Sequence, residues 1–162
     1  MLHGRPVAII GGVRIPFCRQ NTAYADVGNL GMSVRTLGAL VEKFGLHGQQ
    51  LGEVALGAVI KHSSDWNLGR EAALSSGLSP LTPGITLQRA CGTSLDTIVH
   101  IAGKIATGQI QAGIGGGSDT TSDVPIVYGK SLRRRLLKAA ASKTFGQKLA
   151  AFKGFSLREL KP

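Results

Sequence analysis

The stretch Gly84-Ile85-Thr86-Leu87-Gln88-Arg89-Ala90-Cys91-Gly92-Thr93-Ser94 joins a short apolar run to a long helical pattern. Cys91 stands at the junction, where the first free N–H groups of a helix meet the positive end of its dipole. That setting favours the thiolate, which is the reactive form of cysteine. The small residues after Cys91 would let a thioester approach closely. The stretch therefore predicts a strand-to-helix corner with a nucleophilic thiol, and an inert buried cysteine is the alternative.

Strand and helix patterns alternate on both sides of this corner. Residues 29–44 carry apolar side chains at steps of three and four, with Asn29 as the expected N-cap. The helix after Cys91 places Leu95, Ile98 and Val99 on a broad apolar face. We expect strands at residues 7–10, 53–60, 85–90 and 110–115, and helices at 29–44, 67–76 and 91–107. This β-α-β-α-β-α-β order predicts a layered α/β domain with largely parallel strands.

The composition supports a globular α/β chain with one sizeable core. The 162 residues are 43% hydrophobic, and 23 glycines with only 5% aromatic residues indicate tight turns and close packing. No apolar run reaches the roughly 18 residues of a membrane span, and the N-terminus lacks the apolar core of a signal peptide. Two cysteines, Cys18 and Cys91, make no disulfide framework. We therefore expect a cytoplasmic protein without a transmembrane segment.

Positive charge is concentrated at the C-terminal end. Residues 1–129 hold nine Lys and Arg against eight Asp and Glu, whereas residues 130–162 hold ten against Glu159 alone. The tail carries two basic amphipathic stretches, one with Leu132 and Leu136 on a common face and one beginning near Phe145. We therefore divide the chain into an α/β domain at residues 1–125 and a basic helical segment at 126–162.

A nucleophilic cysteine usually needs a histidine as its base, and the chain offers His3, His47, His62 and His100. His100 lies nine residues along the helix from Cys91, about 13 Å away, which is beyond hydrogen-bond reach. His62 is the one candidate that could approach, although a solvated loop histidine is the simpler interpretation. Metal-ligand spacings are lacking, and Gly11-Gly12 lacks the third glycine of a dinucleotide motif, so no metal or resident cofactor is expected.

Four motifs in the same order resemble the N-terminal half of a thiolase, an acetyl-CoA acyltransferase (3-ketoacyl-CoA thiolase). They are Val7-Ala8-Ile9-Ile10-Gly11-Gly12-Val13-Arg14-Ile15-Pro16-Phe17, Asn67-Leu68-Gly69-Arg70-Glu71-Ala72-Ala73-Leu74, Arg89-Ala90-Cys91-Gly92-Thr93-Ser94 and Ala112-Gly113-Ile114-Gly115-Gly116-Gly117-Ser118-Asp119, the last followed by Ser122-Asp123-Val124-Pro125. The tail is similar to that of the β chains of trifunctional fatty-acid-oxidation complexes, in which this segment opens a helical loop domain.

The resemblance implies a function and a set of partners. Cys91 would attack the keto carbon of a 3-ketoacyl-CoA in fatty acid β-oxidation and hold the acyl group as a thioester until coenzyme A, a co-substrate, removes it. The family's activating histidine and second catalytic cysteine lie in Gly-His-Pro and Cys-x-Gly motifs, neither of which occurs in these 162 residues. We therefore expect little or no activity from this chain alone, and association with a second copy or a β-oxidation partner chain.

Two other interpretations stay open. A related condensing protein of the same superfamily would share the cysteine corner, although the glycine-rich strand end and basic tail argue against it. A non-catalytic module could instead use the basic tail on an anionic membrane or nucleic acid. The tail lacks the Tyr and Trp residues that stack on bases, so nucleic acid is not the expected partner.

Overall fold

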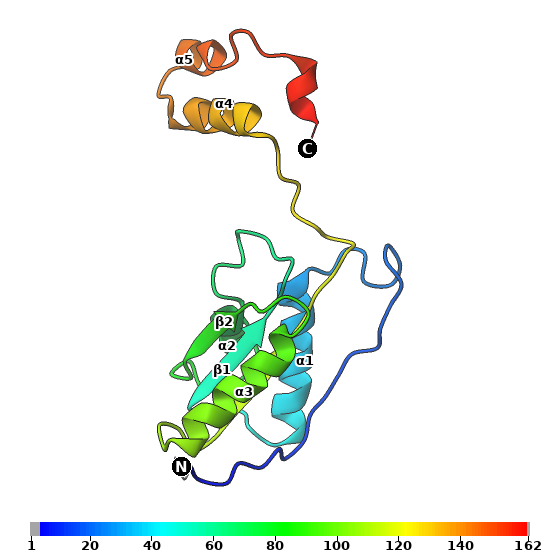
Figure 1. Cartoon of the computed structure of the whole chain (residues 1–162), viewed down its shortest axis with the longest axis vertical. Coiled ribbons are helices and arrows are strands. Elements are labelled where there is room, and N and C mark those ends of the chain that lie inside the picture. Colours follow the sequence, from blue (N-terminus) through cyan, green and yellow to red (C-terminus); the bar gives the residue numbers. More distant parts are fainter. Residues whose placement is uncertain (1–3, 162) are drawn as a thin grey trace. The chain divides into compact units, whose positions relative to one another are not determined.

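The computed structural model describes residues 4–161 and contains two compact units, one ending at Val124 and one beginning at Pro125 (Figure 1). The first unit holds a three-stranded parallel sheet with the strand order β2-β1-β3. Its strands are β1 (Glu53–Gly57), β2 (Gly84–Leu87) and β3 (Gly113–Gly117). Val54 pairs with Gly84 on one side and with Ile114 on the other, so β1 lies in the centre of the sheet. The sequence prediction of an α/β domain with parallel strands is confirmed.

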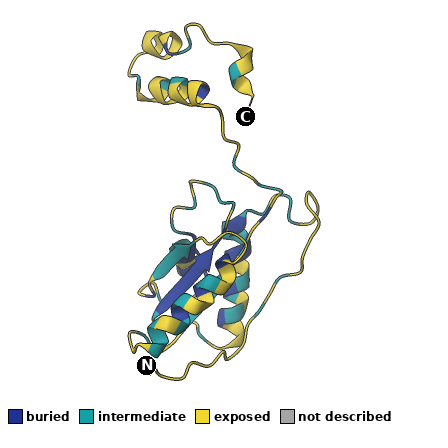
Figure 2. Cartoon of the chain, viewed as in Figure 1, coloured by how far each residue is buried: buried dark blue, intermediate teal, exposed yellow. Residues whose placement is uncertain are grey.

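Alternation along β1 sends its side chains to two helical layers. Val54 and Leu56 pack with Leu37 and Val41 of α1 (Asn29–Lys43) and with alanines of α2 (Leu68–Ser75). Glu53 and Gly57 face α3 (Thr93–Ala106) on the opposite side of the sheet. All five residues of β1 are buried, which Figure 2 shows as a continuous dark strand. The core therefore lies between β1 and the α1–α2 layer.

The helix predicted from residue 29 is confirmed as α1, but its cap differs from the prediction. Gly28 occupies the N-cap position without a side-chain bond, and Asn29 is the first helical residue. The side-chain amide of Asn29 donates instead to the carbonyl of Ile60. An amide buried at the helix start thus holds the loop after β1 rather than the helix end.

Residues 7–10 do not form the strand that their β-branched pattern predicts. A strand needs a neighbouring strand to bond with, and none of the described strands pairs with this segment. The Ile9 and Ile10 side chains are 80% and 83% exposed. The segment is tied down before this point, where Arg5 bonds the carbonyls of Ile105 and Ile110. The first unit therefore has the order α-β-α-β-α-β instead of beginning with a strand.

Helix α3 buries a stripe of two threonines and one isoleucine and exposes several of its apolar side chains. Thr93, Thr97 and Ile101 are buried against the sheet, whereas Leu95 is 67% and Val99 59% exposed. Figure 2 shows buried and exposed positions alternating along α3. The buried stripe is small because α3 approaches β3 closely at Gly115. A Cβ at Gly115 would lie 2.8 Å from the Cα of Ile98. Glycine at this position thus sets the depth at which α3 sits on the sheet.

The second unit is built around one arginine. It contains α4 (Lys130–Ala141), α5 (Phe145–Ala150) and the 3-10 helix η1 (Leu157–Leu160). The guanidinium of Arg135 donates to the carbonyls of Ala151, Lys153 and Gly154, and it forms an ion pair of 3.0 Å with Glu159. The hydroxyl of Ser131, followed by Arg135, holds the pKa of Glu159 below its ordinary value. The half-buried Arg135 side chain therefore joins α4 to the segment after α5 and to η1.

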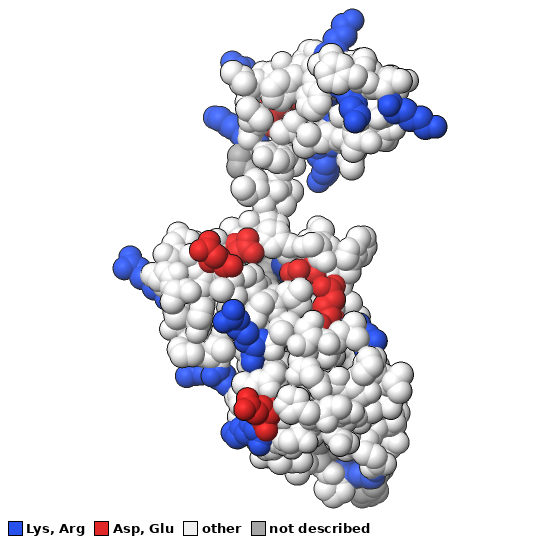
Figure 3. Space-filling view, turned by 180° about the vertical axis from the view of Figure 1, so that it is seen from behind, with Lys and Arg blue, Asp and Glu red and all other residues white. Residues whose placement is uncertain are grey.

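Basic side chains cover the second unit, while Glu159 is its one acidic residue. Figure 3 shows Lys and Arg side chains projecting from it in several directions. Leu132 of α4 is buried, whereas Leu136 and Leu137 remain largely exposed. Within residues 4–161, every helix falls short of the length and apolar content that a bilayer-crossing segment requires.

Candidate active site

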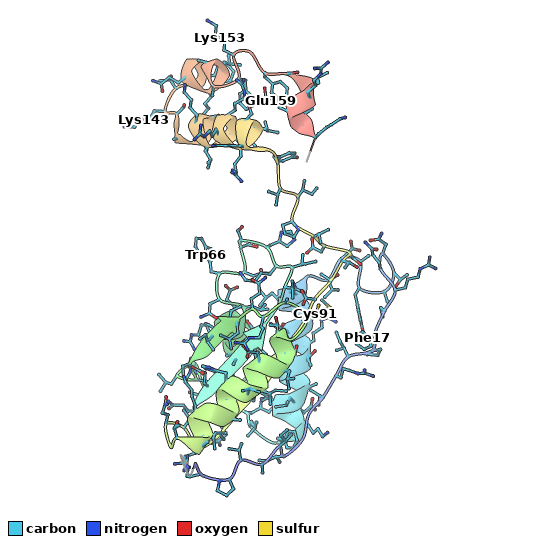
Figure 4. The ribbon with its side chains drawn as sticks, viewed as in Figure 1. Phe17, Trp66, Cys91, Lys143, Lys153 and Glu159 are labelled. Carbon is cyan, nitrogen blue, oxygen red and sulfur yellow. The ribbon has the colours of Figure 1, made fainter. Side chains whose placement is uncertain are left out.

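Cys91 lies at the edge of the sheet where the three parallel strands end. It follows β2 and precedes the first residue of α3, and its side chain is exposed (Figure 4). The structure therefore places the thiol at the strand-to-helix corner that the sequence predicts. The thiol is exposed, so the alternative of a buried cysteine at this position is wrong, and its reactivity stays a prediction.

The corner that carries Cys91 contains an unusual backbone conformation. Ala90 has a φ of +41°, a left-handed value that residues with a Cβ rarely adopt. Arg89 and Cys91 form an isolated bridge across it, and the N–H of Gly92 donates to the carbonyl of Arg89 over 2.9 Å. Strained residues of this kind concentrate where a reactive group is presented. The sequence pattern gives no sign of this turn because alanine fits any regular element.

The buried side chain of Thr93 bonds to the backbone of the turn before Cys91. Its hydroxyl accepts from the N–H of Arg89 and donates to the carbonyl of Ala90, both over 2.7 Å. Thr93 is only 4% exposed, and its methyl group lies directly against Gly57 at the end of β1. The corner before Cys91 is therefore attached to the central strand through one threonine.

Charges around the first turn of α3 partly cancel. Arg89 approaches Asp96 to 3.3 Å, and the Arg89 side chain is largely exposed whereas that of Asp96 is not. An acidic side chain in the first helical turn opposes negative charge on the thiol, and a neighbouring guanidinium offsets it. The local field at Cys91 thus depends on this ion pair as well as on the helix dipole.

Two carboxylates organise the neighbouring loops at the same edge. Asp119, two residues after β3, accepts from the N–H groups of Val59 and Ile60 over 2.8–3.1 Å. Asp123 lies 2.9 Å from the imidazole of His62. In the sequence, Asp119 is recognisable only as part of a motif. Its anchoring role had no local signal, because its partners lie about sixty residues earlier in the chain.

None of the described histidines is hydrogen-bonded to Cys91. His100 contacts Glu53 over 2.7 Å, at the opposite end of β1 from the thiol. His62 is engaged with Asp123, and His47 lies against Gly77. His3 lies outside the described residues. The separation of His100 from Cys91 expected from helical rise agrees with its position at the far end of the strand.

The Glu53–His100 contact belongs to a cluster that also contains Lys104, in which Glu53 is buried and its two partners are half-buried. The ammonium of Lys104 lies 2.8 Å from the Glu53 carboxylate, which is at the start of β1. Burial alone would raise the pKa of Glu53, but the hydrogen bonds from Lys104 and His100 outweigh it and hold that pKa below its ordinary value. This cluster joins α3 to the sheet and lies away from the thiol.

The second cysteine, Cys18, is exposed and lies beside Tyr24. Burial, followed by the neighbouring Cys18, raises the pKa of the Tyr24 hydroxyl. Both cysteines are free thiols. Within residues 4–161, no group of three or more His, Cys, Asp or Glu side chains could hold a metal ion.

Comparisons with known proteins agree with this arrangement. The family described as "Thiolase, N-terminal domain" matches residues 7–154. The 3-ketoacyl-CoA thiolases of Shewanella amazonensis and Photorhabdus laumondii are each 35% identical over 160 residues, which is 99% of this chain and 37% of each relative. The crystal structure of the acetyl-CoA acetyltransferase of Bacillus anthracis aligns with a TM-score of 0.64 at 27% identity, over 68% of this chain and 28% of that one. The chain thus spans little more than a third of the length of the two 3-ketoacyl-CoA thiolases.

Proposed function

Because this chain belongs to the thiolase family, through the family's N-terminal domain, we propose that Cys91 is the nucleophile that receives the acyl group of a 3-ketoacyl-CoA. The observation that carries the proposal is the exposed thiol of Cys91 at the start of α3. The relatives named 3-ketoacyl-CoA thiolase support the substrate class, because they match almost the entire chain.

In the proposed reaction, the sulfur of Cys91 forms a bond to the keto carbon, and the bond between that carbon and the next one towards the thioester breaks. The electron pair leaves with the acetyl-CoA portion, which then takes up a proton. The shortened acyl group stays on the sulfur as a thioester. The thiol of coenzyme A attacks this thioester, loses its proton and restores the Cys91 thiolate as the leaving group.

The start of α3 supplies polar groups for this step. The N–H groups of Gly92 and Thr93 already donate to Arg89 and Ala90. Those of Ser94 and Leu95 follow in the first turn, where a helix has no internal acceptors. We assign to these two groups the stabilisation of the developing oxyanion, which is about 3–4 kcal/mol in comparable sites.

We propose that the proton transfers need groups that the described residues do not supply. Two observations support this assignment. His62 and His100 are hydrogen-bonded to Asp123 and Glu53, and His47 lies beside Gly77 on another part of the surface. No Gly-His-Pro or Cys-x-Gly motif occurs in the sequence. We therefore expect the isolated chain to accept an acyl group slowly and to turn over weakly or not at all.

The assignment is tested by incubating the 162-residue chain with acetoacetyl-CoA and locating acetyl adducts by peptide mass spectrometry. We expect an adduct at Cys91 and none at Cys18, which is also an exposed free thiol and so serves as an internal control. Thiolysis is expected to stay near the level of Cys91→Ala. Equal labelling of both cysteines, or no labelling at Cys91, would refute the assignment of Cys91 as the nucleophile. Turnover well above that of Cys91→Ala would refute the proposal that the 162 residues lack the proton-transfer groups.

Association with a further polypeptide is part of the proposal. Leu95 and Val99 on α3 expose apolar surface that a single soluble unit rarely leaves uncovered. A second copy of the chain or a β-oxidation partner chain would cover it. Sedimentation velocity with Val99→Asp tests this point, because the variant should dissociate a self-associated sample. We place the activity in the cytoplasm, since both free thiols persist in a reducing compartment.

A further inference from the structure

We propose that Thr93 is a positioning residue for Cys91, and this inference deepens the proposed function on which it rests. The hydrogen bonds of the Thr93 hydroxyl go to residues 89 and 90 and not to the sulfur of Cys91. Its hydroxyl instead acts on the two residues that precede Cys91, and its methyl group acts on the strand below them.

The two hydrogen bonds of Thr93 fix opposite ends of one short segment. The hydroxyl accepts from the N–H of Arg89 and donates its proton to the carbonyl of Ala90, so both bonding capacities of the oxygen are directed at residues 89 and 90. The backbone N–H of Thr93 also donates to Ala90 over 3.2 Å. Together these bonds hold Ala90 at its φ of +41°. Without them, an alanine at this position would relax to an ordinary negative φ.

Relaxation of Ala90 would change where Cys91 points, because Cys91 is the next residue. In the present conformation the thiol is exposed at the first turn of α3. The influence of a helix dipole falls off within about one turn. A small displacement of the sulfur therefore weakens the favourable interaction between the dipole and negative charge on the sulfur. Thr93 is buried against Gly57, which prevents its hydroxyl from following the segment if the bonds break.

Thr97 provides a matched control on the same helix. It is also a buried threonine, and its hydroxyl bonds to the carbonyls of Ser94 and Gly116 over 2.7 and 3.1 Å. It makes no hydrogen bond to residues 89–91. Replacement of Thr93 or Thr97 by valine removes one buried hydroxyl in each case, but only the former releases the segment before Cys91.

The test measures the rate at which iodoacetamide alkylates Cys91 in the 162-residue chain carrying Cys18→Ser. We expect Thr93→Val to slow alkylation about two- to fivefold at neutral pH, the factor that corresponds to loss of a helix-terminus interaction. Thr93→Ser retains the hydroxyl and should keep the parent rate. Thr97→Val should also keep it. An unchanged rate in Thr93→Val, equal slowing in Thr93→Ser, or equal slowing in Thr97→Val would each overturn the inference.

A second measurement needs no variant and so does not depend on folding of Thr93→Val. Hydrogen exchange of the Arg89 amide in the parent chain should be slowed, because that N–H donates to Thr93. Exchange at the rate of an open loop would overturn the inference.

The positioning role of Thr93 and the assignment of Cys91 as the acyl acceptor can fail separately. If no acetyl adduct forms on Cys91 while Thr93→Val still slows alkylation, the positioning role stands and the assigned reaction fails.

Discussion

Replacement of Gly115 by alanine tests whether the close approach of α3 to β3 is what seats the candidate nucleophile. A Cβ on Gly115 would lie 2.8 Å from both the N and the Cα of Ile98, and 2.9 Å from the carbonyl carbon of Thr97. All three are backbone atoms, so no side chain can rotate away. Helix α3 must move off the sheet, together with the first turn that follows Cys91.

The expected cost is the balance of two effects. Overpacking a well-packed site destabilises by about 1–3 kcal/mol. A Gly-to-Ala change restricts the unfolded chain, which returns about 0.4–1 kcal/mol. We therefore expect Gly115→Ala to lower the free energy of unfolding by roughly 1–2 kcal/mol. Urea unfolding followed by far-UV circular dichroism measures this quantity.

Gly103 is the matched control because it lies within α3, and a Cβ there would have no atom within 4 Å. Alanine is the better helix former, so Gly103→Ala should raise the free energy of unfolding by up to about 1 kcal/mol. The two variants are thus expected to change stability in opposite directions. If Gly115→Ala were as stable as the parent chain, or if both variants were destabilised equally, the packing argument would fail.

Three further predictions follow from contacts in the two units. Leu68→Ala removes a fully buried side chain and should lower the free energy of unfolding in urea by about 2–5 kcal/mol. A loss under about 1 kcal/mol would contradict this and would mean that neighbouring side chains fill the cavity. Glu53→Ala leaves His100 and Lys104 without their shared carboxylate and should cost about 1–3 kcal/mol, whereas a neutral result would show that the cluster contributes nothing. The lowered pKa of Glu159 makes its contribution to folding present above pH 4.5 and lost as the pH falls through the folded value. An acid titration followed by circular dichroism should therefore lose α4 and η1 signal below pH 4.5 in the parent chain, and show no such step in Glu159→Gln.

Residues 7–10 show why the prediction of a strand before α1 is wrong. Residues 7–10 have the β-branched composition of a strand, but a strand exists only where another strand offers a ladder of hydrogen bonds. That partner is a property of the assembled sheet, and periodicity within four residues carries no information about it. The face of α3 that packs on the sheet was also not predictable from the sequence. Its pattern identifies the helix, but the glycines of β3 decide that the threonine stripe is the one that packs against the sheet.

The order of the remaining helices and strands, their parallel arrangement and the position of Cys91 at a corner after β2 could all be predicted from the amino-acid sequence. These features follow from local rules, because apolar spacing and turn residues act over a few positions. The left-handed φ of Ala90, the contact of Thr93 with Gly57 and the bonds from Asp119 to the loop after β1 are visible only in the folded chain. The contacts with Gly57 and the Asp119 bonds join residues 36 and about 60 positions apart in the chain. Such partners are chosen by packing of the whole unit, and no short stretch of sequence specifies them.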